Sequence, residues 1–187
     1  MKVKEIVINA AKILELNDVV DYLNDDTIEV SDDIKNDLAK LLLAVNMTSN
    51  MLASEYVELL NSVDVVAENN FIDYSKISDN AIVEIKSVRD YGNNDIDYQK
   101  LKNGIVIVGD SARILYSYLP KEFLLEDDLT EFSNMNAIVF SQGVVSEYLF
   151  LKGDLQESYS WDEKFKNSLE SLKRVKRNIN LPVREWV

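Results

Sequence analysis

A basic and partly aromatic segment ends an acidic chain, and its side chains suit binding rather than catalysis. Residues 173–187 carry five basic residues and one acidic residue, a net charge of +4, whereas the whole chain has a formal net charge of −13. Residues 1–172 therefore carry −17. Basic side chains next to apolar residues and a tryptophan are typical of segments that dock on a protein. The basic charge predicts an acidic target and a faster encounter with it.

The predicted partner-binding residues form two groups. Basic residues at the end of the last predicted helix supply charge, and the residues beyond it supply apolar contacts along an extended path, because Pro182 prevents the helix from continuing. A solvated helix end followed by a frayed terminus is the alternative interpretation. The predicted set is Lys173, Arg174, Lys176, Arg177, Ile179, Leu181, Pro182, Val183, Arg184 and Trp186.

The chain lacks most of the residues that enzymes use. It has no Cys, which excludes disulfides, thiolate chemistry and cysteine zinc sites. It has no His, which removes the commonest general base and transition-metal ligand. We therefore expect no enzyme activity, no cofactor and no metal site. A carboxylate-based enzyme is a third interpretation, since enzymes can work with Asp, Glu, Lys and Tyr alone.

Acidic runs lie at residues 21–26, 31–33, 93–98 and 124–129. Solvated loops and helix N-termini explain them, and an acidic lumen past which DNA slides is a second interpretation. The run at 93–98 lacks the Gly and the distant Glu of an EF-hand loop. The stretch GIVIVGD at 104–110 lacks the Gly-Lys-Ser/Thr ending of a phosphate loop, and we expect a strand there.

Helical periodicity predicts the elements before and after a central β region. We expect Ser31 to cap the third helix, Asn17 or Asp18 to cap the second, and Gly153 to end the fourth. The fourth helix is apolar almost all round, which favours a central place in the core. The predicted aromatic core residues are Phe140, Tyr148 and Phe150 on this helix and Trp161 and Phe165 on the fifth. The predicted helices span about 2–16, a short piece from 17, 32–53, 136–152 and 154–176.

The central region is rich in Val, Ile and Tyr, with turn signals between short runs. A hairpin is expected on Lys102-Asn103-Gly104. Tyr91, Tyr98, Tyr116 and Tyr118 are expected to pack across strands, and the stretch FIDYSKISDN from residue 71 reads as a linker. About four antiparallel strands are expected, drawn from 63–68, 81–90, 96–101, 104–109 and 112–120.

The layout and three stretches resemble the bacteriophage head-to-tail adaptor family, which includes the tail tubular protein A of short-tailed phages. The first stretch, ARILYSYLPKEFLLEDDLTEF, has an aromatic strand, a proline and an acidic loop. The second is the helix NAIVFSQGVVSEYLFLKGD, and the third is SWDEKFKNSLESLKRVKR. The matching residues are Tyr116, Tyr118, Pro120, Glu126, Asp127, Asp128, Ala137, Gly143, Tyr148, Trp161 and Phe165.

The resemblance implies an α+β fold: an antiparallel bundle of about four helices, a small antiparallel β-sheet between the second and third long helices, and an extended C-terminal arm. We expect one domain at 1–177, with the β insertion at about 63–120, and the arm at 178–187.

The resemblance also implies a structural virion protein. About twelve copies would form a ring under the portal protein, the arm would bind the portal, and a downstream tail protein would bind the far side. DNA would pass through the lumen without specific binding. The protein would reside in the virion, and in the host cytoplasm during assembly, without a membrane. The alternative is an acidic binding protein of the DNA-mimic type that inhibits a basic protein partner.

Overall fold

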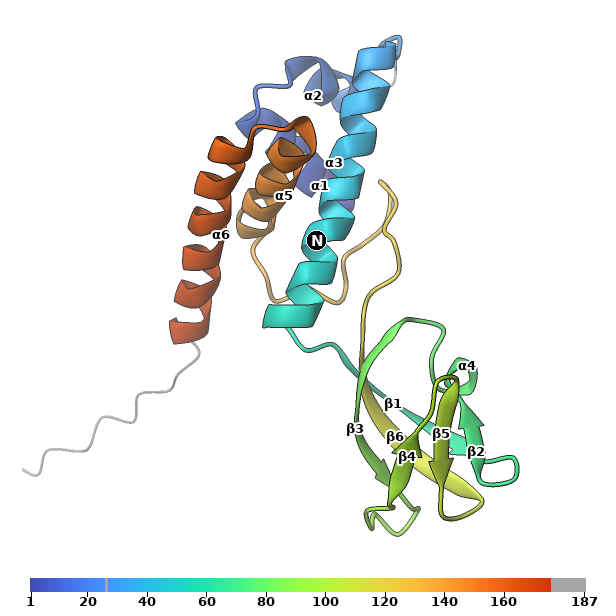
Figure 1. The fold of residues 1–187 in the computed structure, drawn as a ribbon. Coiled ribbons are helices and arrows are strands. Elements are labelled where there is room, and N and C mark those ends of the chain that lie inside the picture. Colours follow the sequence, from blue (N-terminus) through green and yellow to red (C-terminus); the bar gives the residue numbers. More distant parts are fainter. Residues whose placement is uncertain (26, 176–187) are drawn as a thin grey trace, which may run out of the picture. The chain divides into compact units, whose positions relative to one another are not determined.

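The computed structural model describes residues 1–25 and 27–175, and the side chains up to residue 171 (Figure 1). The chain forms two compact units. The helical unit comprises Met1–Thr48 and the chain from Phe123 onward. The β unit comprises Ser49–Glu122.

The fold of the described residues is α+β, with six helices and two small antiparallel sheets of three strands each. The predicted bundle of about four helices with one inserted sheet is therefore wrong. Two short helices add to the four long segments. The β region divides because β6 pairs with β1 and β3, whereas β5 pairs with β2 and β4.

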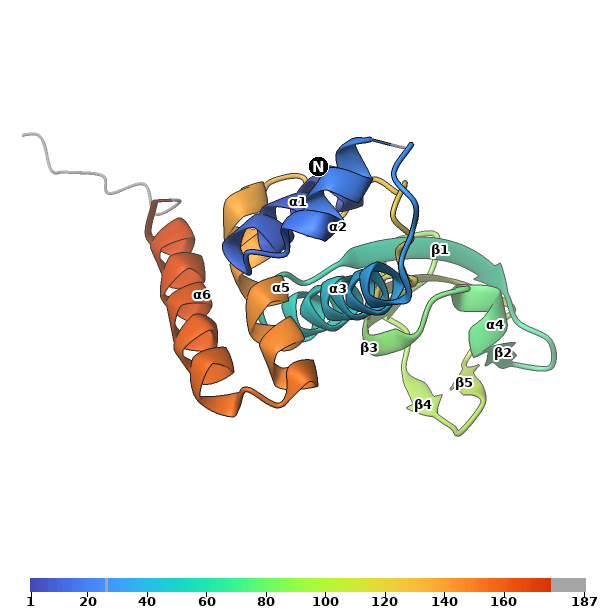
Figure 2. The same ribbon diagram turned by 90° about the horizontal axis from the view of Figure 1, so that it is seen from above.

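Five of the six helices belong wholly or mainly to the helical unit. Helix α5 lies between α1 and α6 (Figure 2). Gly143 of α5 lies close to two other helices: a Cβ there would lie 2.7 Å from Thr48 Cγ2 of α3 and 2.9 Å from the Phe165 ring of α6. The helices are α1 (Val3–Ile13), α2 (Asn17–Asn24), α3 (Asp32–Met51), α5 (Ala137–Lys152) and α6 (Leu155–Val175).

Local capping explains most of the helix boundaries. The Ile34 amide donates to Ser31 Oγ at 3.2 Å, so the predicted cap of α3 is confirmed. Asn136 caps α5 through the Ile138 amide, and Gly153 ends α5 with φ of 88°. The predicted cap of α2 is wrong, because the helix begins at Asn17 after Leu16 with no side-chain cap bond.

The core of the helical unit contains most of the predicted aromatic residues. Phe140, Tyr148 and Phe165 are buried and Trp161 is half-buried. Phe150 is 54% exposed, so its prediction as a core residue is wrong. An all-round apolar helix does not reveal which residue of its last turn lies outside the contacts with α1 and α6.

The β unit begins at Ser49 in the last turn of α3, which passes into a π-helical turn at Leu52–Tyr56. One sheet has the order β1-β6-β3 and the other the order β2-β5-β4. Both sheets contribute to one hydrophobic cluster, which includes Val65, Ile85, Ile105 and Ile114. The elements are β1 (Leu60–Val66), β2 (Phe71–Asp73), α4 (Tyr74–Ile77), β3 (Ile82–Arg89), β4 (Tyr98–Lys100), β5 (Gly104–Ile107) and β6 (Ser111–Tyr118).

Strand β2 and helix α4 occupy the stretch that the sequence predicts as a linker. Ile72 is fully buried in β2, and Asp73 caps α4 by accepting from the Ser75 amide at 2.8 Å. The hairpin on Lys102-Asn103-Gly104 is confirmed, since β4 and β5 are antiparallel neighbours joined by these turn residues.

Candidate functional surfaces

Most of the predicted partner-binding residues lie outside the described residues. These are Lys176, Arg177, Ile179, Leu181, Pro182, Val183, Arg184 and Trp186. Lys173 and Arg174 belong to the last turn of α6. Their contact with a partner remains a prediction.

Three large apolar side chains are exposed on the residues before and after the turn from α5 to α6. Phe150 is 54%, Leu155 62% and Tyr159 71% exposed, and we call these three residues the tip cluster. Leu155 and Tyr159 are four residues apart on α6 and so share one side of the helix. Large apolar side chains gathered in one short segment are typical of a contact surface.

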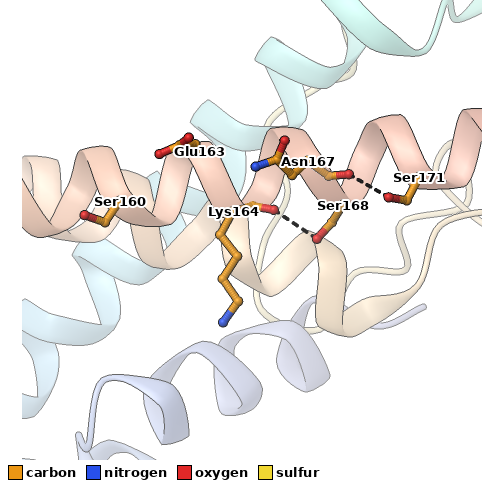
Figure 3. Close-up of a pocket in the computed structure, with 6 residues that line it drawn as sticks. All are labelled: Ser160, Glu163, Lys164, Asn167, Ser168 and Ser171. Atoms are coloured by element: carbon orange, nitrogen blue, oxygen red, sulfur yellow. Dashed lines mark hydrogen bonds between the residues drawn. The ribbon is translucent and has the colours of Figure 1, made fainter.

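A polar hollow of about 420 Å³ runs along α6 and is lined by Ser160, Glu163, Lys164, Asn167, Ser168 and Ser171 (Figure 3). Ser168 Oγ donates to the Lys164 carbonyl oxygen at 3.0 Å, and Ser171 Oγ donates to that of Asn167 at 2.9 Å. Ser168 Oγ also lies 2.9 Å from Gln142 Oε1 of α5, so both hydroxyl protons have acceptors within the protein. Without an adjacent base, neither serine is set up as a nucleophile.

A small network joins α3 to α5 at Asp37. Tyr148 Oη and Lys152 Nζ both donate to Asp37 Oδ1, at 2.9 and 2.8 Å. Burial, with the bond to Asp37, raises the pKa of Tyr148 to about 12, so the phenol stays protonated. Burial tends to raise the pKa of Asp37, but the bonds from Lys152 and Tyr148 lower it overall. A neutral phenol bonded to a carboxylate suits a structural anchor and not a general base.

A second group of charges lies between α5 and α6. Burial and the nearby charge of Asp162 raise the pKa of Glu147, and Lys166 opposes them. Lys166 Nζ is bonded to Asp162 Oδ2 at 2.7 Å. Burial first, and then repulsion by the Asp162 carboxylate, make ionisation of Glu147 unfavourable for the folded state.

The β unit carries its ion pairs on exposed surfaces. Arg113 binds the Asp64 carboxylate through two bonds, at 2.8 and 3.1 Å, across the outer face of sheet β1-β6-β3. Lys86 bonds both Glu58 and Glu84, and these bonds raise the pKa of Lys86. Such exposed pairs contribute little to stability.

Two further hollows lie in the β unit. One, of about 340 Å³, lies between α4 and β3, and its lining includes Asn80, whose Oδ1 is buried with no hydrogen-bond partner among the described residues. The other, of about 260 Å³, is lined by Glu55, Glu58, Glu84 and Lys86 among others. Neither contains an arrangement of nucleophile, base and oxyanion donor.

Within the described residues, no group of three carboxylate, His or Cys side chains could hold a metal ion. None of the described helices is both long enough and apolar enough to cross a membrane.

Sequence reasoning missed the Asp37 network and the tip cluster. Tyr148 and Lys152 stand four residues apart, which hints at a pair on one helix face, but Asp37 is 111 residues from Tyr148. For the tip cluster, the available signal was the pair of apolar residues Leu155 and Tyr159 in the first two turns after Gly153.

Comparison of the chain with models of known protein families gives no match, and a search of curated proteins likewise gives no significant match.

Proposed function

We propose that this protein is a structural component of a bacteriophage or prophage particle, a head-to-tail adaptor that assembles as a ring under the portal. The ring would hold about twelve copies, connect the portal to a downstream tail protein and let DNA pass through its lumen. The chain would act in the virion and, during assembly, in the host cytoplasm. No reaction is part of this role.

The observation that carries the proposal is the exposure of apolar side chains on both units. The tip cluster lies on the helical unit, and Leu60 and Val66 are exposed on the outer face of the β unit. A subunit of a closed ring needs two different surfaces for its neighbours, and an adaptor needs further surfaces for the components on each side. Surfaces on separate units meet this need.

The basic segment at 173–187 supports the same proposal. Its charge of +4 is opposite to that of the remaining chain, which favours contact with a different, acidic surface. A DNA mimic, the alternative function, has no use for five basic residues in one segment. We therefore assign residues 173–187 to the portal contact.

The test is the particle mass of the portal ring at low salt, measured by mass photometry with and without this protein. We expect the mass to increase by about twelve times the 21.4 kDa of one chain. Deleting residues 178–187 should abolish the increase while the circular dichroism spectrum stays unchanged. No increase at any ratio would overturn the proposal and favour the acidic binding protein, whose basic partner a pull-down would then identify.

A further inference from the structure

Strand β1 has one paired edge and one open edge. Its register with β6 is continuous from Leu60 to Val66, and no other described strand pairs with it. The Ala67 amide donates to the Asp110 carbonyl oxygen, and the Tyr118 amide donates to that of Leu59. Because backbone groups alternate sides along a strand, odd-numbered residues of β1 face β6 and even-numbered residues face the open edge. Figure 2 shows β1 along the border of the β unit.

The even-numbered residues of β1 also carry the exposed side chains. Leu60 is 49% and Val66 65% exposed, and Ser62 and Asp64 are exposed between them. Odd-numbered residues point to the opposite face, where Val65 lies in the hydrophobic cluster. The open backbone edge and the exposed apolar side chains therefore belong to the same residues. The Ser62 amide on this edge bonds to Asn61 Oδ1 at 2.8 Å, and the backbone groups of Leu60, Asp64 and Val66 on the same edge are a template for an added strand.

The sequence of residues 178–183, Asn-Ile-Asn-Leu-Pro-Val, has the complementary pattern. Ile179, Leu181 and Val183 alternate with polar residues and Pro182, a period of two that is typical of a strand with one apolar face. Proline has no backbone N–H, so in an added strand Pro182 must point away from the partner. The odd-numbered residues of the segment would then bond to the partner strand.

These two patterns together determine which residues would stand opposite each other, odd-numbered against even-numbered. Odd-numbered residues of the segment would stand opposite the even-numbered residues of β1, and side chains of opposed residues lie on the same face. Ile179, Leu181 and Val183 would thus cover the outer face beside Leu60 and Val66. We propose that residues 178–183 of a second copy add to the open edge of β1 as a fourth strand of sheet β1-β6-β3.

Charge at the two ends favours the same occupant. Arg177 and Arg184 flank the segment, and Glu58 and Glu68 flank β1. The side chain of Glu58 is half exposed and that of Glu68 largely exposed, although each has a lysine partner. The choice of a second copy rests on the proposed ring, in which one strand contact would repeat from copy to copy. This arrangement narrows the portal contact proposed above to the residues of 173–187 outside the paired segment, which include Lys173, Arg174 and Trp186.

The test is hydrogen exchange of the full chain alone, at single-amide resolution and over a range of protein concentrations. We expect the amides of Leu60, Asp64 and Val66 to exchange about tenfold more slowly at high concentration. The variant Leu181→Pro with Pro182→Leu keeps the composition but reverses the pattern, and should lose this protection. The variant Ile179→Leu with Leu181→Ile keeps the pattern and should retain it.

Three outcomes would overturn the inference. Exchange that does not change with concentration, and is the same in the chain lacking 178–187, would mean that the segment does not cover the edge. Protection that is independent of concentration but lost on that deletion would assign the segment to its own copy. Concentration-dependent protection that persists in the variant Leu181→Pro with Pro182→Leu would mean that a different segment pairs with the open edge of β1. Since no portal is present, each result is separate from the test of portal binding.

Discussion

The helical unit and the β unit differ in where their polar groups lie. In the helical unit, a buried serine joins two helices: Ser146 Oγ of α5 donates to the Ser158 carbonyl oxygen of α6 at 2.9 Å. Ser141 Oγ lies 2.8 Å from the Ala137 carbonyl oxygen of its own helix and 3.3 Å from that of Ile6 in α1. In the β unit, the ion pair of Asp64 and Arg113 lies on an exposed face. The comparison indicates that polar contacts of the helical unit hold its helices together, whereas the β unit leaves an outer face and a strand edge for other molecules.

The largest expected effect tests the core of the helical unit. Phe165 is fully buried against α5, so Phe165→Ala should lower the free energy of unfolding by about 3–5 kcal/mol. Tyr159→Ala, on the exposed side of the same helix, should change it by less than about 0.5 kcal/mol. Urea unfolding followed by tryptophan fluorescence measures the free energy of unfolding of both variants. An equal loss in Phe165→Ala and Tyr159→Ala would contradict the assignment of the two residues to opposite sides of the helix.

A close backbone contact tests the β unit in the same way. A Cβ at Gly104 would lie 2.2 Å from the Ile72 carbonyl oxygen, so Gly104→Ala should destabilise the pairing of β2 and β5 by about 1–3 kcal/mol. Hydrogen exchange should accelerate in β2 and β5 but not in α5. The exposed control Val108→Ala should change neither. Equal acceleration in α5 would show that the two units unfold together.

The Asp37 network predicts a pH-dependent contribution in the helical unit. Asp37→Asn weakens two bonds to a charged acceptor and should cost about 1–2 kcal/mol at pH 7. The pKa of Asp37 is lowered on folding from 3.8, so this contribution is present above that value and disappears as the pH falls through the lower folded pKa. In acid denaturation, the difference in the free energy of unfolding between wild type and Asp37→Asn should therefore decrease as the pH falls. A constant difference would argue against the network.

Glu147 gives the smallest expected effect, with the opposite sign. The pKa of Glu147 is raised on folding from 4.5, so its ionisation destabilises the folded state above the raised value. Glu147→Gln should increase the melting temperature at pH 7, with a gain below about 1 kcal/mol, and the gain should vanish as the pH falls to 4.5. The variant Glu163→Gln, at an exposed position, serves as the control. A loss of stability in Glu147→Gln at pH 7 would contradict a destabilising ionisation of Glu147.

Local signals predicted the elements better than their assembly. Ser31, Asn103-Gly104 and Gly153 act through neighbouring residues, and their caps and turn are found where the sequence places them. The division into two sheets depends on pairings such as Val63 with Ile114, about fifty residues apart, which no local pattern encodes. Strand β2 is three residues long, too short for a periodicity to be read.

The candidate surfaces were predictable only in part. The basic segment is evident from charge alone, because +4 stands out against an acidic chain. The tip cluster was hidden, since Leu155 and Tyr159 fit the apolar spacing of a buried helix face. Which side of α6 is buried depends on how α5 packs against it, a tertiary property.

The most direct test of the central claim is electron microscopy of particles made by the phage or prophage after deletion of this gene. The adaptor function predicts DNA-filled heads without tails, restored to tailed particles by the full chain but not by the chain lacking residues 178–187. Tailed, infectious particles in the absence of the protein would contradict the proposed function.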